Sequence, residues 1–172
     1  NRYTFLGSSR DTVTFEPYSY NSNKFRWSEG NPKLYSAMLY VKRGGVLREY
    51  IPMSVGFAKY GYNDKGEILL FDKPLSLKKE RYNSAADAKS TEAQIKALKA
   101  KGVNCLCPDY PQPKWFYSIC DRLGVYVIDS AAIASPSSGD NRAIGGTPSN
   151  DPDLVEEYLV RVEAMYRRAQ NH

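Results

Sequence analysis

The sequence has little histidine and cysteine, and these shortages argue against several kinds of site. Its only histidine is His172, and its three cysteines are Cys105, Cys107 and Cys120. A zinc site would need more ligands of these types, and three cysteines do not make a disulfide framework. We place Cys105 and Cys107 on opposite faces of one strand, where they cannot share a partner. We therefore expect buried thiols, with no metal and no cofactor.

Long apolar runs are also missing. None approaches the roughly 20 residues that a membrane-spanning helix needs, and no signal-peptide pattern is present. We expect no membrane partner, and a cytoplasmic or periplasmic location that the sequence does not decide. The chain opens and stops abruptly on polar residues, which we interpret as a piece cut from something longer.

The charge balance is basic but not concentrated. Lysine and arginine number 24 against 19 acidic residues, a net charge of +5. Basic residues gather only beside apolar positions of two predicted helices, at Lys96, Lys99 and Lys101 and at Arg161, Arg167 and Arg168. Nucleic-acid binding needs one contiguous basic stripe, so we interpret both clusters as solvated helix faces and expect no nucleic-acid partner.

Residues 1–70 have the patterns of antiparallel strands. Strands are predicted over 12–15, 34–41, 46–51, 55–62 and 68–71, with a hairpin turn at Gly44 and Gly45 and another turn over 63–66. At 172 residues and 42% hydrophobic composition, the chain can bury the core of one domain or of two small ones.

The stretch 104–129 predicts a strand, a proline-bounded turn, a short helix and a second strand. Gly124 lies where the helix should end, because that position favours a residue that tolerates positive φ. The apolar run 125–128 is typical of a strand buried on both faces, so the stretch predicts a parallel βαβ unit.

Two further helices flank this unit. One is predicted over 91–101, capped by Ser90 or Thr91 and stopped by Gly102. A loop over 135–150 precedes the other, which starts near Pro152 and carries an apolar stripe along its length.

The stretch 104–129 resembles glycoside hydrolase family 2, the β-galactosidase and β-glucuronidase family. The family has N-A-V-R-x-S-H-Y-P in the second barrel strand, followed by W-Y-x-L-C-D-x-x-G-L-Y-V-x-D-E-A-N. The matching positions here are Asn104, Tyr110, Pro111, Trp115, Cys120, Asp121, Gly124, Tyr126, Val127, Asp129 and Ala131. The end of the family's immunoglobulin-like domain is similar to the segment that contains Trp27, Ser28, Pro32, Leu34 and Tyr35.

The resemblance implies an α/β fold in two parts. A partial immunoglobulin-like β-sandwich would span 1–66, and a partial (β/α) barrel of about three βα units would span 67–172. A complete barrel needs eight units and about 250 residues, so the remainder of a longer chain or a homo-oligomer is the expected partner. The alternative is a rearranged three-layer α/β sheet.

The resemblance also implies retaining glycoside hydrolysis, which needs two carboxylates roughly 5 Å apart. In the family both catalytic glutamates come from barrel strands beyond the position of His172, so no catalytic residue is assigned here. Pocket positions differ too: Ser130 and Ala132 replace the family's Glu and Asn after Asp129, and no histidine follows the first barrel strand. The chain by itself is therefore expected to be inactive.

Asp109, Tyr110 and Asp129 remain as candidate substrate contacts. The alternatives are that Asp109 caps the turn before Pro111 and that Asp129 anchors a strand end. Tyr110 and Trp115 could stack on a sugar or be buried against the neighbouring helix. Two functions stay open, a fragment of a β-galactosidase-like hydrolase and a non-catalytic carbohydrate-binding or assembly module with its pocket erased. A carbohydrate of the β-galactoside type is the expected ligand in either case.

Overall fold

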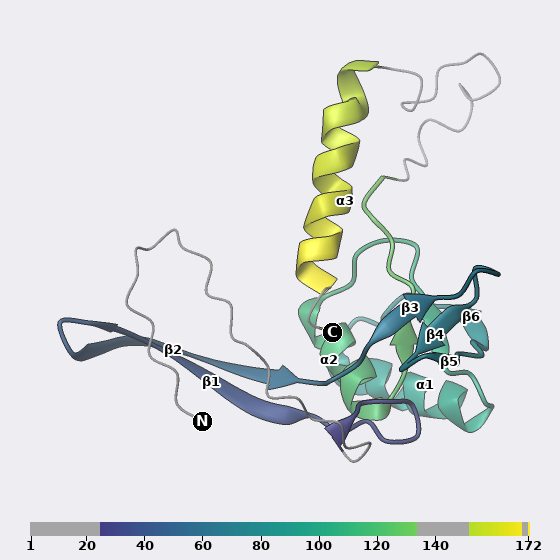
Figure 1. Ribbon diagram of the computed structural model, residues 1–172, viewed down its shortest axis with the longest axis horizontal. Coiled ribbons are helices and arrows are strands. Elements are labelled where there is room, and N and C mark those ends of the chain that lie inside the picture. The colour runs from purple at the N-terminus through teal and green to yellow at the C-terminus, as the bar shows by residue number, and fades with distance from the viewer. Residues whose placement is uncertain (1–24, 134–151, 170–171) are drawn as a thin grey trace.

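The computed structural model describes residues 25–133, 152–169 and 172, so the predicted strand over 12–15 and loop over 135–150 lie outside the described residues. Figure 1 shows the arrangement. The strands are β1 (Tyr35–Arg43), β2 (Val46–Val55), β3 (Tyr60–Tyr62), β4 (Ile68–Leu70), β5 (Lys73–Pro74), β6 (Lys79–Arg81), β7 (Cys105–Cys107) and β8 (Tyr126–Val127). The helices are α1 (Ala88–Ala100), α2 (Lys114–Leu123) and α3 (Val155–Ala169), the last preceded by a 3₁₀ turn, Pro152–Leu154.

The parallel sheet is the centre of the fold. Its strand order is β6-β7-β8, with Lys79 opposite Cys105 and Cys105 opposite Tyr126. Helix α1 connects the first pair and α2 the second, which confirms the predicted βαβ unit and agrees with part of a (β/α) barrel. The strand predicted over 125–128 is shorter than expected: β8 covers only Tyr126–Val127, although the Ile128 N–H still donates to the Leu106 carbonyl of β7 at 3.0 Å.

Strand alternation divides the core into two clusters. On the helix side, Leu106 packs with buried side chains of α1 and α2, including Ile95 and Phe116. On the other side, Cys105 and Tyr126 pack with Trp27, and Cys107 adjoins them. Our placement of Cys105 and Cys107 on opposite faces was therefore wrong, because residues two apart on a strand share a face.

The helix boundaries follow from capping. Helix α2 ends at Gly124, which has φ of 66°, as predicted. Helix α1 starts earlier than predicted: its N-cap is Asp87, whose carboxylate accepts from the Ser90 N–H at 2.8 Å. Thr91 is fully buried inside the helix, and its hydroxyl accepts from the Ala85 N–H instead of capping the end.

One lysine of the predicted solvated face has a structural role. Lys99 of α1 reaches the other helix and donates to the carbonyls of Leu123 and Gly124, and also to that of Glu29. A cation at these carbonyls complements the negative end of the α2 dipole. Lys99 was thus wrongly placed in solvent, whereas Lys96 is exposed and pairs with Glu92 on the same helix.

The antiparallel strands form two further sheets. In the part of the chain that the structure describes, strands β1 and β2 pair with no other strand and form a hairpin that projects away from the helices (Figure 1). Strands β3, β4 and β5 form the other sheet, and β3 pairs with β4 across the turn that contains Gly66. The boundary that we predicted between the sandwich and the barrel, 66/67, falls at the end of this turn. Among the described residues no second sheet covers the hairpin, so the sandwich over 1–66 stays a prediction.

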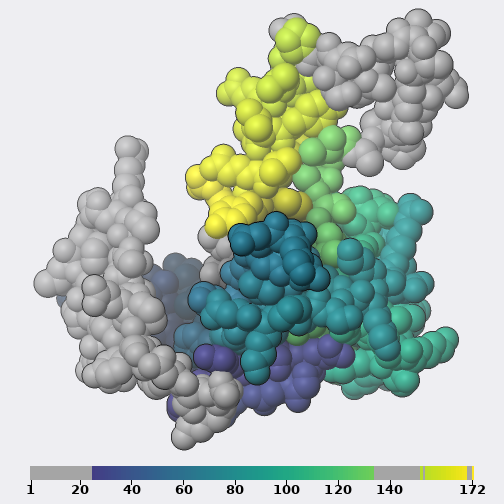
Figure 2. Space-filling view, turned by 45° about the vertical axis from the view of Figure 1, so that its right-hand side comes forward, coloured from purple at the N-terminus to yellow at the C-terminus, as the bar shows by residue number. Residues whose placement is uncertain are grey.

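The C-terminal end of helix α3 contacts the rest of the described structure, and the helix extends away from it (Figure 1). Figure 2 shows it in yellow beside the green residues that follow β8. None of its described side chains is buried, and its predicted apolar stripe is open, with Leu159 64% and Tyr166 66% exposed. Within the described ranges, no helix has the length and apolar character to cross a membrane.

Candidate functional site

The carboxyl ends of the three parallel strands carry a connected set of polar side chains. Arg81 ends β6, Asp109 follows β7, and Asp129 follows β8. Ligand sites of parallel α/β folds form at this edge, because the loops after each strand meet there. This edge is therefore the candidate site.

Asp109 joins the ends of β6 and β7. One carboxylate oxygen accepts from Arg81 Nε at 2.6 Å and the other from Asn83 Nδ2 at 2.8 Å. The Asp109 N–H in turn donates to Asn83 Oδ1 at 3.1 Å. Hydrogen bonds from Arg81 and then Asn83 hold the pKa of the Asp109 carboxyl below its usual range, so the group stays ionised. Asp109 therefore pins a neighbouring strand end rather than capping the turn before Pro111.

The buried side chain of Gln112 holds the side chain of Asn83 in place. Gln112 is 7% exposed, and its Nε2 donates to Asn83 Oδ1 at 3.2 Å and to the Tyr110 carbonyl at 2.7 Å. Its Oε1 accepts from the Ser84 N–H at 2.8 Å. Every polar atom of this side chain thus has a partner, which is the condition for burying an amide at little cost.

Asp129 lies at the centre of a second set of contacts. Its Oδ1 accepts from the Tyr117 hydroxyl at 2.9 Å and from the Ser130 N–H at 3.0 Å. Its Oδ2 accepts from Arg168 of α3 at 2.7 Å. The Asp129 side chain is only 9% exposed. These contacts support the interpretation that Asp129 anchors a strand end, and they extend it to α3.

Tyr117 connects the two sets of contacts. Its hydroxyl also accepts from the Gln112 N–H at 3.0 Å, and the Arg168 guanidinium lies 5.4 Å from its ring centre. Burial is the main cause that raises the pKa of Tyr117, so its hydroxyl keeps its proton and remains a donor to Asp129. A continuous polar network therefore runs along the carboxyl edge from β6 to α3.

The two aromatic candidates differ in exposure. Tyr110 is 57% exposed, which contradicts its burial against the helix and leaves its ring available. Trp115 is half-buried and packs against the helix-side core cluster. The alternative of burial is thus confirmed for Trp115 alone.

Sequence reasoning missed four residues of this edge: Arg81, Asn83, Gln112 and Arg168. Arg81 ends a strand whose three residues are all charged, and Asn83 follows it, so no apolar pattern marked this strand. Arg168 was assigned to solvent because it lies in a basic helix end. Only the fold places it next to Asp129, 39 positions earlier.

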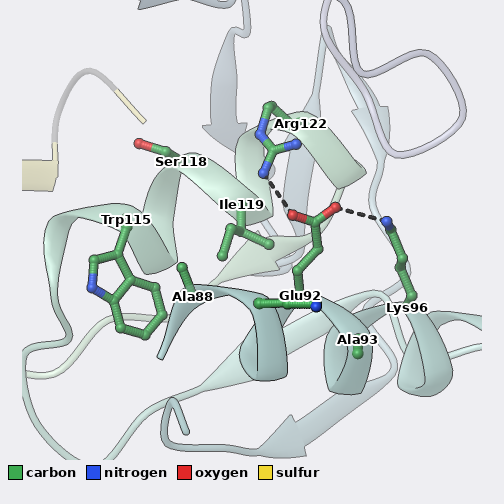
Figure 3. Close-up of a pocket in the computed structure, with 9 residues that line it drawn as sticks. Ala88, Glu92, Ala93, Lys96, Trp115, Ser118, Ile119 and Arg122 are labelled. Atoms are coloured by element: carbon green, nitrogen blue, oxygen red, sulfur yellow. Dashed lines mark hydrogen bonds and ion pairs between the residues drawn. The ribbon is translucent and has the colours of Figure 1, made fainter. Parts of the chain in front are cut away.

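One cavity lies away from this edge, and a second reaches it. A groove of about 610 Å³ runs between α1 and α2 on the outer side, where Glu92 pairs with Lys96 and Arg122 beside Trp115 (Figure 3). A smaller pocket of about 290 Å³ lies on the other side of the parallel sheet and includes Tyr117 and Asp129 of the polar edge in its lining, together with Trp27, Tyr126 and His172 among others. Among the described residues no cluster of three His, Cys, Asp or Glu side chains is arranged to hold a metal ion.

Residues 78–172 match the family model of the TIM barrel domain of glycosyl hydrolases family 2. This match includes all three parallel strands and the whole polar edge. It covers more than half of the chain.

Curated relatives agree with the family model. The chain is 29% identical over 163 residues to a β-galactosidase of Lactobacillus delbrueckii subsp. bulgaricus, covering 85% of this chain and 16% of the relative. It is 28% identical over 158 residues to a β-galactosidase of Streptococcus thermophilus, with 85% and 15% covered. The chain thus spans about a sixth of the length of these relatives.

Solved structures show the same fold. A β-glycosidase from Bacteroides vulgatus superimposes with a TM-score of 0.64 at 19% identity, covering 87% of this chain and 20% of that one. A glycosyl hydrolase family 2 member from Bacteroides cellulosilyticus superimposes with a TM-score of 0.57 at 26% identity, covering 61% and 16%.

Proposed function

The chain belongs to glycoside hydrolase family 2, and we propose that it forms part of a β-galactosidase-like enzyme that hydrolyses O-glycosidic bonds. The observation that carries this proposal is the position of the family match, 78–172, which includes the parallel sheet together with its polar carboxyl edge. Substrates of barrel enzymes bind at that edge.

Both catalytic glutamates of the proposed enzyme lie outside these 172 residues. A glycosidase acid/base needs a carboxyl whose pKa is raised, so that it carries a proton to donate. The contacts with Arg81 and Asn83 lower the pKa of Asp109, so Asp109 does not suit that task. Catalysis is therefore supplied by sequence that follows His172.

An assay with nitrophenyl β-galactoside tests this proposal. The purified 172-residue chain should give no turnover above buffer, whereas the gene product extended beyond His172 should hydrolyse the substrate. Turnover by the 172-residue chain would refute the proposed location of the glutamates. An extended protein with no turnover on any nitrophenyl glycoside would refute the hydrolase.

A second candidate is a pseudo-enzyme, namely a non-catalytic carbohydrate-binding or assembly module on the same scaffold. It is favoured by the internal partners of Asp109 and Asp129, which leave these carboxylates few free lone pairs. Sugar binding by the extended protein without turnover would select this candidate over the first.

For either candidate we propose Asp109, Tyr110 and Asp129 as sugar contacts. The exposed ring of Tyr110 supports a stacking contact, and the one-third exposed side chain of Asp109 supports a polar one. Asp129 has least support, because only 9% of its side chain is exposed.

The proposed assembly has an immunoglobulin-like sandwich over 1–66 and a barrel over 67–172, completed by the remainder of a longer chain or by a second copy. Exposed apolar side chains on both faces of the β1–β2 hairpin, such as Leu39, Tyr40 and Ile51, support a covering partner. Light scattering of the chain at several concentrations would separate a homo-oligomer from a monomer that needs the longer chain.

A further inference from the structure

Cys105 and Cys107 lie on the same face of β7 as two neighbouring thiols. They are the first and last residues of this strand, and side chains two positions apart point to one side of a sheet. Both pack in the cluster of Trp27 and Tyr126, on the side of the parallel sheet away from α1 and α2. Because the two cysteines share a face, they can also share a ligand.

The two thiols interact directly. After burial, the causes that raise the pKa of Cys105 are the charge of Cys107 and a hydrogen bond between the two side chains. Both cysteines are free. The Cβ atoms of residues two apart on a strand are about 6.6 Å apart, whereas those of a disulfide are about 4 Å apart. The spacing is therefore too wide for a sulfur–sulfur bond, but it suits a single atom that bridges the two sulfurs.

The number and type of the ligands select the bridging ion. Among the described residues, no third His, Cys, Asp or Glu side chain joins the pair in an arrangement that would hold a metal ion. A structural zinc ion needs four ligands, and Mg²⁺ and Ca²⁺ need oxygen ligands. Cu(I) is a soft ion that prefers thiolates, and two of them in a linear arrangement are enough to bind it. The pair therefore fits Cu(I).

Two cations flank the thiols on the neighbouring strand. Lys79 is opposite Cys105 and Arg81 is opposite Cys107, and paired residues of a parallel ladder point to one side. Lys79 counteracts part of the rise in the pKa of Cys105, so its ammonium group lies close to that thiol. A Cu(I) ion with two thiolates carries one negative charge, which a neighbouring ammonium stabilises. Arg81 contributes less, because its guanidinium is paired with Asp109.

The burial of the pair provides both an entry and an enclosure. Cys105 is fully buried, whereas Cys107 is half-buried at the carboxyl end of β7. Leucine side chains pack around the same cluster, namely Leu34, Leu70, Leu75 and Leu77. An ion can thus enter past Cys107, and the apolar surroundings then limit the access of water and oxidants to it.

We propose that Cys105 and Cys107 form a two-thiolate binding site for Cu(I). One Cu⁺ ion and two S–H groups give a bis-thiolate complex of charge −1, and the two protons pass to the buffer. Copper keeps its oxidation state, so no oxidant or reductant takes part in the step. The site is independent of the proposed function, because neither cysteine is among the proposed sugar contacts.

Two measurements on the 172-residue chain test the proposal. In the first, the chain competes with the chromogenic chelator bicinchoninate for Cu(I) that ascorbate keeps reduced under nitrogen. We expect the chain to take one Cu(I) from the chelator. In the second, Ag(I) replaces Cu(I) as a redox-inert probe in weakly buffered solution at pH 7 with an indicator dye. We expect two protons to be released for each Ag(I) bound.

Variants identify the ligands. Cys105→Ser and Cys107→Ser should each raise the dissociation constant for Cu(I) at least about 100-fold, since the loss of a ligand costs more than the loss of an outer-shell partner. Cys120→Ser is the matched control, because Cys120 is also a buried thiol but packs in the helix-side cluster. It should bind Cu(I) as the wild type does. Circular dichroism verifies that each variant is folded.

A chemical block provides the same test without a substitution in the core. Alkylation of Cys107 by iodoacetamide in the folded wild type should abolish Cu(I) binding, and bound Cu(I) should protect Cys107 from alkylation. This measurement keeps the proposal testable if Cys105→Ser does not fold.

The other outcomes overturn the proposal. Wild-type affinity for Cu(I) no higher than that of the Cys105→Ser/Cys107→Ser double variant would show that the pair is no site. Binding that survives either single variant, or the release of one proton for each Ag(I), would show that the thiols do not bind the ion together. A loss of affinity in Cys120→Ser as large as in the other variants would place the ion elsewhere. None of these results changes the proposed function.

Discussion

Gly124 occupies a position that no other residue can fill without rearrangement. Its φ of 66° lies in the left-handed region, and a Cβ atom there would meet the Glu29 carbonyl oxygen at 2.6 Å. The chain turns here from α2 into β8. The backbone of Glu29 packs directly against this turn. Two separate costs, strain and collision, therefore act on any side chain at this position.

We predict that Gly124→Ala lowers the free energy of unfolding more than Gly66→Ala does. Gly66 has a similar φ of 74°, but a Cβ atom there would meet no described atom within 4 Å, so its substitution carries the strain of about 1–2 kcal/mol alone. Urea unfolding of both variants measures the difference. Equal losses would show that the Glu29 backbone moves away at no cost.

The three thiols differ in their surroundings. Burial is the main cause that raises the pKa of Cys105 to about 11, with the neighbouring Cys107 second. Burial also raises the pKa of Cys120. Cys107 is half-buried at the end of β7.

We predict that iodoacetamide at pH 8 modifies Cys107 first and leaves Cys105 and Cys120 nearly unreacted, because thiolate is the reactive form. Mass spectrometry of the alkylated chain measures the order. The pKa values of Cys105 and Cys120 are higher in the folded than in the unfolded chain. The free energy of unfolding should therefore fall as pH rises from about 9 towards 11, because the unfolded chain loses these protons first. Rapid labelling of Cys120 in the folded chain would contradict the expectation.

At the scale of elements, α3 is attached by polar contacts rather than by a buried face. Arg168 bonds to Asp129 and to the Tyr117 hydroxyl, and Arg161 donates to the Ala132 carbonyl at 2.7 Å. His172 Nδ1 lies 2.6 Å from Asp121 Oδ2 of α2. Most helices dock through an apolar stripe, but the stripe of α3 faces open space within the described residues.

Arg168→Met should therefore release α3 from the carboxyl edge. We expect the amides of Val155–Ala169 to exchange with deuterium several-fold faster, whereas those of α2 keep their rates. Tyr166→Met is the control, because Tyr166 lies in the same turn of the helix and is 66% exposed, so its replacement should change exchange little. Unchanged exchange in Arg168→Met would mean that other contacts hold the helix.

At the scale of the whole molecule, the hairpin β1–β2 and the parallel sheet differ sharply in burial. Every residue of β2 except Val55 is exposed, whereas Cys105 and Leu106 of β7 are fully buried. A two-stranded hairpin alone is marginally stable in water, so the stability of the chain is concentrated around the parallel sheet.

We predict that backbone amides of β1 and β2 exchange with deuterium much faster than those of β7 in the isolated chain. Mass spectrometry of peptides from the two regions gives the comparison at one set of conditions. Protection of the hairpin equal to that of β7 would instead show that a partner, such as a second copy, covers it in solution.

Local patterns made much of the parallel unit predictable. The helix over 114–123 and the strand that follows were recognisable from apolar periodicity, prolines and one glycine, all within 26 consecutive residues. The N-terminus of α1 was misplaced, because Asp87, Ser90 and Thr91 are all acceptable caps by residue type. Only packing decided that Thr91 is buried and Asp87 is the cap.

The sequence by itself determined the family, the order of the βα units and the turn at Gly124, because these depend on residues near one another along the chain. The tertiary structure alone decided the partners of the charged groups. Arg81 meets Asp109 across 28 positions and Arg168 meets Asp129 across 39. The first pair arises because neighbouring parallel strands bring their carboxyl ends to one edge, and the second because the C-terminal end of α3 packs on that edge. No local pattern encodes which distant charge will lie there.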